Sequence, residues 1–239
     1  AAAVLGQDTG LWLAAAAPGD DIDHATHGLA AVERGKRPAQ HLDALDILKR
    51  GGTAMDAAIA GALVLGICEP QMTGIGGDLF ALVSPANSND IFAYNGSGRA
   101  PKAASAEALR ENGHTAVPLQ SPDSVTIPTA MHAFSQMSET WGKLGFDTLL
   151  QPTIDYAEAG IPVAPRVAFD WMDSAPTLQG YAKEHYLING NVPKTGDVFR
   201  APGQAEALRR VAKNGIQAFY EGEVAEDMIA ALNALGGVH

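Results

Sequence analysis

Apolar residues recur with helical spacing in two consecutive segments in the first third of the chain. In residues 39–50, AQHLDALDILKR, leucines three positions apart share one face of a predicted helix. Residues 54–67, AMDAAIAGALVLGI, are apolar on almost every face, which is typical of a helix buried on all sides. Thr53 and Asp56 have the spacing of a capping box, so the second helix is predicted to begin directly after Thr53.

Two short apolar segments further along the chain predict a β-hairpin. LFALVS at residues 79–84 and IFAYN at residues 91–95 flank PANSND, whose composition is that of a turn.

GIPVAPR, residues 160–166, is predicted to interrupt helical structure, and residues 180–200 to form turns and short extended pieces. Amphipathic patterns predict helices over residues 105–112, 129–141, 149–158, 203–214 and 223–235. One hairpin among many helices indicates an α+β class, and residues 1–239 read as a single domain without a repeat or linker.

The charge balance limits the partners that the chain can bind. It carries 27 acidic against 16 basic residues, a formal net charge of −11, and has no Lys/Arg cluster, which argues against a nucleic-acid partner. No apolar run reaches the roughly 18 residues of a membrane span. Residues 1–21 lack the basic leader of a signal peptide. Two locations therefore remain open: the cytoplasm, or a periplasmic or secreted location with a leader already removed. The alanine-rich start is expected to be a weakly packed extension.

Few residues qualify as catalytic groups from the sequence alone. The single cysteine, Cys68, lies in the apolar run ALVLGICEP and is interpreted as a small buried side chain without an adjacent base. The seven histidines show no metal-binding spacing, so no metal and no cofactor are predicted. There is no GxSxG motif and no assignable Ser-His-Asp triad, so the chain shows no nucleophile of its own.

The glycine-rich stretch GIGGD, residues 74–78, lacks the spacing and the lysine of a phosphate-binding loop. Its glycines indicate instead a backbone crowded against another strand or a ligand, where a side chain would not fit. Asp78, at the end of this stretch, is expected either to cap nearby N–H groups or to line a site.

Three long blocks of the chain resemble, in order, the large subunit of the γ-glutamyltransferase family. They are LDILKRGGTAMDAAIAGALVLGICEPQMTGIGGDLFALV at residues 45–83, residues 124–168 beginning SVTIPTAMHAF, and residues 188–232 beginning INGNVPKTGDVF, followed by GGV. The resemblance extends from His27 to His239 and leaves residues 1–26 outside.

The resemblance implies the four-layer αββα sandwich of the N-terminal-nucleophile hydrolases, with this chain supplying helices and some strands of an incomplete large subunit. In that family a precursor cleaves itself before a threonine, which then begins a separate small subunit. The threonine hydroxyl attacks an amide carbon with its own α-amino group as base, and water or an amine resolves the acyl-enzyme. The partners implied are therefore the small subunit of the same precursor and a small-molecule amide, and the nucleophile lies outside this chain.

The family holds the substrate carboxylate with an arginine in a pattern like R-E-x-A-P, because a guanidinium fork matches a carboxylate. Aligning Ala100 and Pro101 with its last two residues places Ser97 at the arginine position, Gly98 at the glutamate, and Arg99 two residues late. A serine cannot replace a bidentate cation, which argues against ordinary γ-glutamyl transfer.

Asp78 also stands where the family's usual GIGGGG run has a glycine. Together, GGD and GSGRAP resemble a branch of the family that includes oxamate amidohydrolase. The resemblance thus implies four substrate-binding candidates: Arg99, Ser97, Asn95 and Asp78.

Three hypotheses follow. The leading one is a self-processed amidohydrolase or acylase that works as a large/small heterodimer. The second is a true γ-glutamyltransferase or glutathione hydrolase, in which Arg99 or a small-subunit residue takes over the carboxylate clamp. The third is a non-catalytic relative that binds a ligand or a partner.

Overall fold

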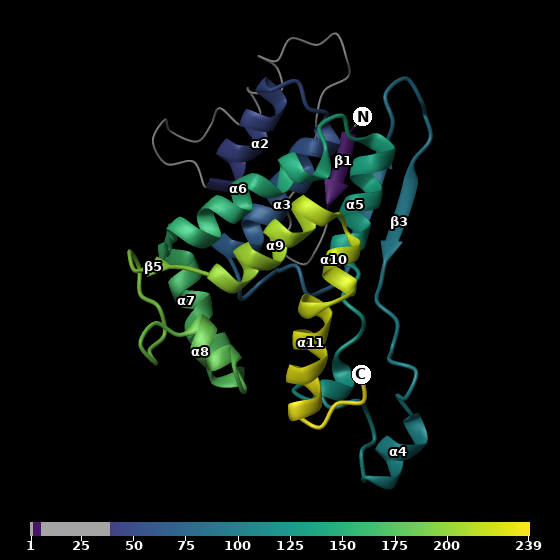
Figure 1. Cartoon of the computed structure of the whole chain (residues 1–239), viewed down its shortest axis with the longest axis vertical. Coiled ribbons are helices and arrows are strands. Elements are labelled where there is room, and N and C mark those ends of the chain that lie inside the picture. Colours follow the sequence, from purple (N-terminus) through teal and green to yellow (C-terminus); the bar gives the residue numbers. More distant parts are fainter. Residues whose placement is uncertain (1, 6–38) are drawn as a thin grey trace.

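The computed structural model describes residues 2–5 and 39–239, which form a helix-rich α+β structure with one three-stranded sheet (Figure 1). The predicted α+β class is therefore confirmed. In chain order the elements are β1 (Ala2–Leu5), α2 (Ala39–Lys49), α3 (Ala54–Cys68), β2 (Leu79–Ser84), β3 (Phe92–Gly96), α4 (Ala106–Glu111), η1 (Pro122–Ser124), α5 (Ala130–Trp141), α6 (Phe146–Ala159), β4 (Ile161–Pro162), α7 (Pro165–Ser174), η2 (Ala175–Thr177), α8 (Ala182–Tyr186), β5 (Val198–Phe199), α9 (Pro202–Asn214), α10 (Gln217–Tyr220) and α11 (Glu223–Ala234). No helix within the described ranges combines the length and apolar character needed to cross a bilayer.

Helix α3 lies at the centre of the structure and packs against α2, α5, α6 and β1. Most of its residues are buried, as the apolar pattern on all its faces predicts. The predicted capping box is present: the Thr53 hydroxyl accepts from the Asp56 N–H at 3.2 Å, and the Thr53 N–H donates to Asp56 Oδ2 at 2.7 Å.

The Asp56 carboxylate also joins α3 to the turn between α5 and α6. It is fully buried and accepts hydrogen bonds from the backbone N–H groups of Lys143 at 2.9 Å and Leu144 at 3.3 Å. A Cβ atom at Gly142 would lie 2.5 Å from Asp56 Oδ1, so this turn passes too close for a side chain. One buried anion therefore caps a helix and anchors a distant turn.

Strands β2 and β3 form the predicted antiparallel hairpin, with Leu79 opposite Gly96. Burial alternates along β2: Leu79, Ala81 and Val83 face the helices and are buried, whereas Phe80 and Leu82 are about half exposed on the opposite face.

β1 adds a third antiparallel strand, with Ala2 opposite Ser84 and Leu5 opposite Ala81. The alanine-rich start was expected to be a weakly packed extension, and for residues 2–5 this expectation is wrong, because their backbone completes a sheet edge.

A smaller hydrophobic cluster lies around α7 and the β4–β5 pair, in the region where turns and helix interruption are predicted. Trp171 packs edge-to-face against Phe199, with ring centroids 5.0 Å apart. Helical structure is interrupted after α6 as predicted, but the interruption is short, because α7 already begins at Pro165. Proline fits this position, since its fixed φ suits a helix start and the N–H that it lacks would be unpaired there.

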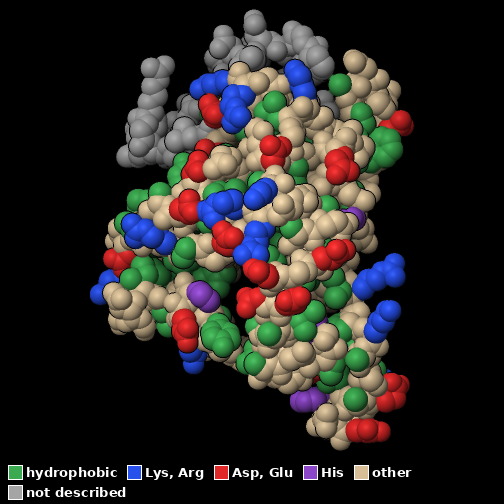
Figure 2. Space-filling view, viewed as in Figure 1, with side chains coloured by type: hydrophobic (Ala, Val, Ile, Leu, Met, Phe, Trp, Pro, Cys, Tyr) green, Lys and Arg blue, Asp and Glu red, His purple; other side chains and the backbone are tan. Residues whose placement is uncertain are grey.

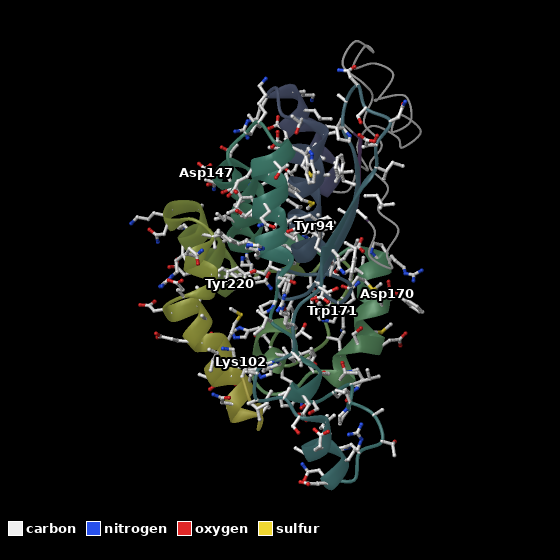
Figure 3. The ribbon with its side chains drawn as sticks, turned by 90° about the vertical axis from the view of Figure 1, so that its right-hand side faces the viewer. Tyr94, Lys102, Asp147, Asp170, Trp171 and Tyr220 are labelled. Carbon is white, nitrogen blue, oxygen red and sulfur yellow. The ribbon has the colours of Figure 1, made fainter. Side chains whose placement is uncertain are left out.

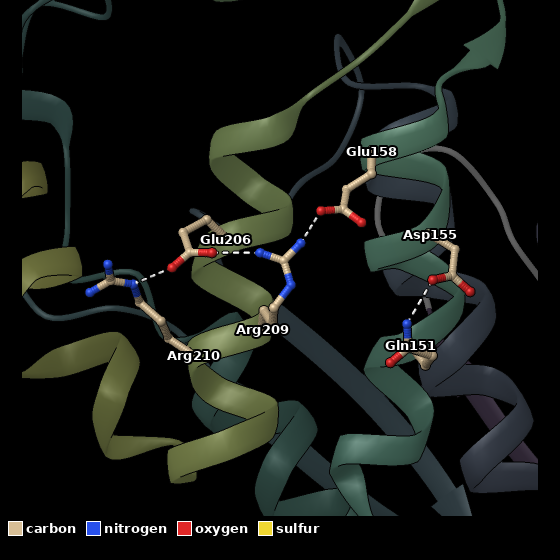
Figure 4. A network of polar contacts seen from close by, with 6 residues as sticks. All are labelled: Gln151, Asp155, Glu158, Glu206, Arg209 and Arg210. Carbon is tan, nitrogen blue, oxygen red and sulfur yellow. Dashed lines mark hydrogen bonds and ion pairs between the residues drawn. The ribbon is translucent and has the colours of Figure 1, made fainter.

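Ion pairs on the surface connect α9 to its neighbours. Arg209 pairs with Glu158 of α6 and with Glu206, and Arg210 pairs with Glu206 at 2.9 Å (Figure 4). Arg210 also pairs with Glu223 of α11. Charged side chains of both signs gather over this helix in the space-filling view (Figure 2). Pairs this exposed contribute little to stability, so the apolar contacts of α6 with α9 carry the packing.

Candidate functional site

Two loops leave the same end of the β2–β3 hairpin. Residues 74–78 lead into β2 and residues 97–101 follow β3, and the facing positions Leu79 and Gly96 pair in the sheet. Asp78 Oδ1 accepts a hydrogen bond from the backbone N–H of Gly98 at 2.9 Å, which ties the two loops together. Of the two roles expected for Asp78, capping of N–H groups is therefore present, but the N–H belongs to the second loop and not to its own turn.

The second loop is also held from the other side by the segment that leads into α5. The Ile127 N–H donates to the Arg99 carbonyl at 2.9 Å, and the Thr129 hydroxyl donates to the Gly96 carbonyl. A Cβ atom at Gly98 would lie 2.1 Å from the Ile127 carbonyl oxygen, so only glycine fits at this position. The loop is thus held by backbone contacts on both sides.

Asn95 and Ser97 bond to each other. Asn95 Oδ1 accepts from the Ser97 N–H at 3.0 Å and from the Ser97 hydroxyl at 2.6 Å, which is an Asx-type turn. Both residues are exposed. By register Asn95 lies opposite Phe80, on the open face of the sheet.

Arg99 is exposed, and its guanidinium forms no ion pair or hydrogen bond with any residue of the described part of the chain. Its backbone is nonetheless anchored through its carbonyl. The structure therefore brings Asp78, Ser97 and Arg99 into one pair of tied loops, with Asn95 at the adjoining end of β3. Substrate binding by them stays a prediction.

The glycines of the first loop are not crowded by the described chain. A Cβ atom built on Gly74, Gly76 or Gly77 would meet nothing within 4 Å, and none of the three has the positive φ that favours glycine. The predicted crowding against another strand of this chain is therefore wrong for the described residues. Within the described part of the chain, the space beside these three glycines is open to a ligand or a partner chain.

A groove of about 500 Å³ begins at this glycine loop. Gly76 forms one wall, and helices α9 to α11 form the other with an apolar floor that includes Phe219 and Met228. Its rim is charged, with Glu206, Arg210, Glu223 and Asp227.

Sequence reasoning missed a polar cluster beside the second loop. The Tyr94 hydroxyl donates to Gln136 Oε1, and the Tyr220 hydroxyl donates to the Pro128 carbonyl at 2.7 Å while accepting from the His132 N–H at 3.1 Å. Figure 3 shows Tyr94 and Tyr220, which come from β3 and α10. Burial raises the pKa of both phenols, so they stay protonated donors at neutral pH. No local sequence signal could have found a cluster that three separate segments build.

Residues 43–239 match the family model described as gamma-glutamyltranspeptidase. The chain is 32% identical to the glutathione hydrolase-like YwrD proenzyme of Bacillus subtilis over 80% of this chain and 36% of that protein. It is 33% identical to the oxamate amidohydrolase proenzyme of Klebsiella pneumoniae over 89% of this chain and 40% of that protein. It therefore spans about two fifths of the length of these curated relatives.

The chain is also similar to a solved structure, the cephalosporin acylase from Bacillus halodurans. The TM-score is 0.77 at 36% identity, over 84% of this chain and 39% of that chain.

Proposed function

The chain belongs to the γ-glutamyltranspeptidase family, and from that premise we propose that it is the large-subunit part of a self-processed amidohydrolase or acylase. The observation that carries the proposal is the state of the second loop. The Ser97 hydroxyl donates a hydrogen bond to Asn95 Oδ1. Arg99 is the one cationic side chain in residues 97–101, and it is exposed. The sequence has no GxSxG motif and no assignable Ser-His-Asp triad, which agrees with a nucleophile supplied by another chain.

The proposed reaction uses a threonine at the start of a small subunit cut from the same precursor. Its hydroxyl oxygen bonds to the amide carbon and passes its proton to the threonine α-amino group. The carbon–nitrogen bond then breaks, and the amine leaves with that proton. Water attacks the resulting ester, releasing the acid and restoring the hydroxyl.

The open face of the sheet supports a partner layer at this place. Phe80 and Leu82 are 48% and 50% exposed there, and their cross-strand neighbours Asn95 and Ala93 share that face. The opposite face is covered by helices of this chain. We propose that strands of the small subunit cover Phe80 and Leu82, which would place the partner beside Asn95.

Arg99 indicates the class of substrate. A guanidinium without a partner on the described part of this chain suits an anionic acyl group. Oxamate carries a carboxylate directly beside its amide, and the similarity to an oxamate amidohydrolase makes a short anionic amide the first substrate to test.

The deciding experiment is to purify the full-length gene product and sequence the N-termini of its fragments. We expect a fragment that begins with threonine, and a single uncleaved chain when that threonine is replaced by alanine. Absence of any fragment beginning with threonine would overturn the proposal and favour a non-catalytic binding relative.

A true γ-glutamyltransferase or glutathione hydrolase is the second candidate, favoured by the similarity to a glutathione hydrolase-like protein. In that case Arg99 or a small-subunit residue holds the substrate carboxylate. Turnover of a γ-glutamyl anilide in preference to oxamate would select this candidate, and turnover of oxamate alone would exclude it.

A further inference from the structure

Residues 127–130, which lead into α5, hold both loops of the candidate site through their backbone. The Ile127 N–H donates to the Arg99 carbonyl at 2.9 Å, and the Ala130 N–H donates to the Gly77 carbonyl at 2.9 Å. Arg99 lies in the second loop and Gly77 in the first. The position of residues 127–130 therefore sets where the Arg99 backbone lies relative to the first loop.

The start of α5 lacks the usual side-chain cap. Thr129 is the N-cap residue, but its hydroxyl makes no capping hydrogen bond and donates to the Gly96 carbonyl. The first N–H groups of a helix have no carbonyl partner within that helix. His132, the third residue of α5, therefore needs an acceptor for its N–H from another part of the chain.

The Tyr220 hydroxyl supplies this acceptor from the end of α10 (Figure 3). Its oxygen accepts from the His132 N–H at 3.1 Å, and its proton is donated to the Pro128 carbonyl at 2.7 Å. Pro128 precedes the N-cap residue and His132 follows it. One hydroxyl thus joins the two sides of the bend at which the chain enters α5.

The Tyr220 ring is held by packing that does not involve its hydroxyl. Phe219, the preceding residue, is 2% exposed in the main core and packs edge-to-face against the Tyr220 ring, with centroids 5.1 Å apart. The His132 ring lies on Tyr220 at a centroid distance of 6.4 Å. Tyr220→Phe therefore removes the two hydrogen bonds and keeps the ring in place.

We propose that Tyr220 is a positioning residue for Arg99. Its hydroxyl fixes residues 127–130, and their backbone fixes the Arg99 carbonyl, so that the guanidinium lies where it can bind an anionic amide. Tyr220 touches no substrate in this role. The binding of substrate by Arg99 rests on the proposed function, whereas the hold of Tyr220 on the loop rests on the hydrogen bonds alone.

Hydrogen exchange in the full-length gene product tests the hold on the loop. In Tyr220→Phe we expect the N–H groups of Ile127 and Ala130 to exchange about three- to tenfold faster than in the wild type, the factor that corresponds to the loss of one ordinary hydrogen bond. Exchange in α3 should not change. Tyr186→Phe is the matched control, because it removes a phenol hydroxyl that accepts from Gln204 at 3.0 Å in the cluster around α7.

Unchanged exchange at Ile127 and Ala130 in Tyr220→Phe, or the same acceleration in Tyr186→Phe, would overturn the proposal.

A double-mutant cycle with Arg99→Ala tests whether Tyr220 acts through Arg99, with oxamate as the substrate. Tyr220→Phe should raise KM about three- to tenfold with a smaller change in kcat. In the Arg99→Ala background it should raise KM little further, because both residues serve one contact. A merely structural role would raise KM by the same factor in both backgrounds, and that result would overturn the assignment. If the wild type does not turn over oxamate, the proposed substrate is wrong, and the exchange rates decide whether Tyr220 holds the loop.

Discussion

The Asp78 carboxylate accepts a hydrogen bond from the Gly98 backbone N–H across 20 residues of sequence, and this bond ties together the two loops at the end of the hairpin. We expect Asp78→Ala to leave that N–H without its acceptor, at a cost of about 1–3 kcal/mol. Hydrogen exchange at Gly98 should therefore accelerate while exchange in α3 does not. Asp78→Asn keeps an acceptor oxygen, so its rate of exchange at Gly98 should lie between those of the wild type and of Asp78→Ala.

Asp173→Ala is the matched control, since Asp173 is exposed on α7. If the Gly98 N–H exchanges equally slowly in Asp78→Ala and in Asp173→Ala, the hydrogen bond from Gly98 to Asp78 does not hold the loop.

Gly98 and Gly76 allow a comparison of two glycines with opposite surroundings. A Cβ atom at Gly98 would lie 2.1 Å from the Ile127 carbonyl oxygen, whereas one at Gly76 would meet nothing within 4 Å. We expect Gly98→Ala to lower the free energy of unfolding by about 1–3 kcal/mol, because backbone must move, and Gly76→Ala to change it little. Urea denaturation measures both, and equal losses would contradict the structure.

Gly76 is expected to matter for activity and not for stability. If a ligand or partner chain approaches the bare loop, Gly76→Ala should reduce turnover or subunit association in a protein that folds normally.

The buried Asp56 carboxylate is the largest single polar contribution that we expect to stability. It accepts from the backbone N–H groups of Thr53, Lys143 and Leu144, so Asp56→Ala leaves three backbone N–H groups without this acceptor. At about 1–3 kcal/mol for each unsatisfied donor, we expect a loss of at least about 3 kcal/mol, measured by urea denaturation. Asp147→Ala, which removes an exposed carboxylate from the first turn of α6, should cost less than about 1 kcal/mol.

Asp43 predicts a pH dependence of stability. Burial raises its pKa, a hydrogen bond from Tyr156 lowers it, and Asp46 and Asp155 raise it further. Because the net pKa is raised, the folded state favours the protonated form. The stabilisation is complete below the ordinary pKa of 3.8 and is lost as the pH rises through the raised value.

Asp43→Asn should consequently melt at a higher temperature than the wild type at pH 7, and this advantage should vanish near pH 3. The asparagine keeps the volume and can still accept from Tyr156. Asp46→Asn, at an exposed position on the same helix, is the control. A wild type that melts above Asp43→Asn at pH 7 would show that the folded state favours the charged carboxylate instead.

Arg99 is expected to act in substrate binding. Arg99→Ala should raise KM for an anionic amide by about 10- to 100-fold, the equivalent of losing one charge-assisted contact, with a smaller effect on kcat. Arg99→Lys should recover part of the loss, because lysine keeps the charge and loses the fork. Arg110→Ala, on the exposed helix α4, should leave KM unchanged.

The sequence by itself determined most of the local structure and the family. The apolar faces of α3, the capping box at Thr53 and the alternation along β2 are short-range patterns, and each predicted its element within a few residues. Helix α7 was missed because a proline that stops one helix can also start the next, and local composition does not distinguish these cases. The order of three long blocks identified the family, which the match over residues 43–239 confirms.

Only the tertiary structure decided what the chemically interesting residues contact. Asp78 was expected to cap nearby N–H groups or to line a site, and the N–H that it caps is that of Gly98, 20 residues away in sequence, because the hairpin brings distant loops to one end. The Gln71 amide, whose two polar atoms are shielded from solvent and unpaired within the described chain, has no sequence signal at all. Periodic patterns report the environment along one element, whereas hydrogen bonds and cavities between elements depend on how far apart the folded chain places them.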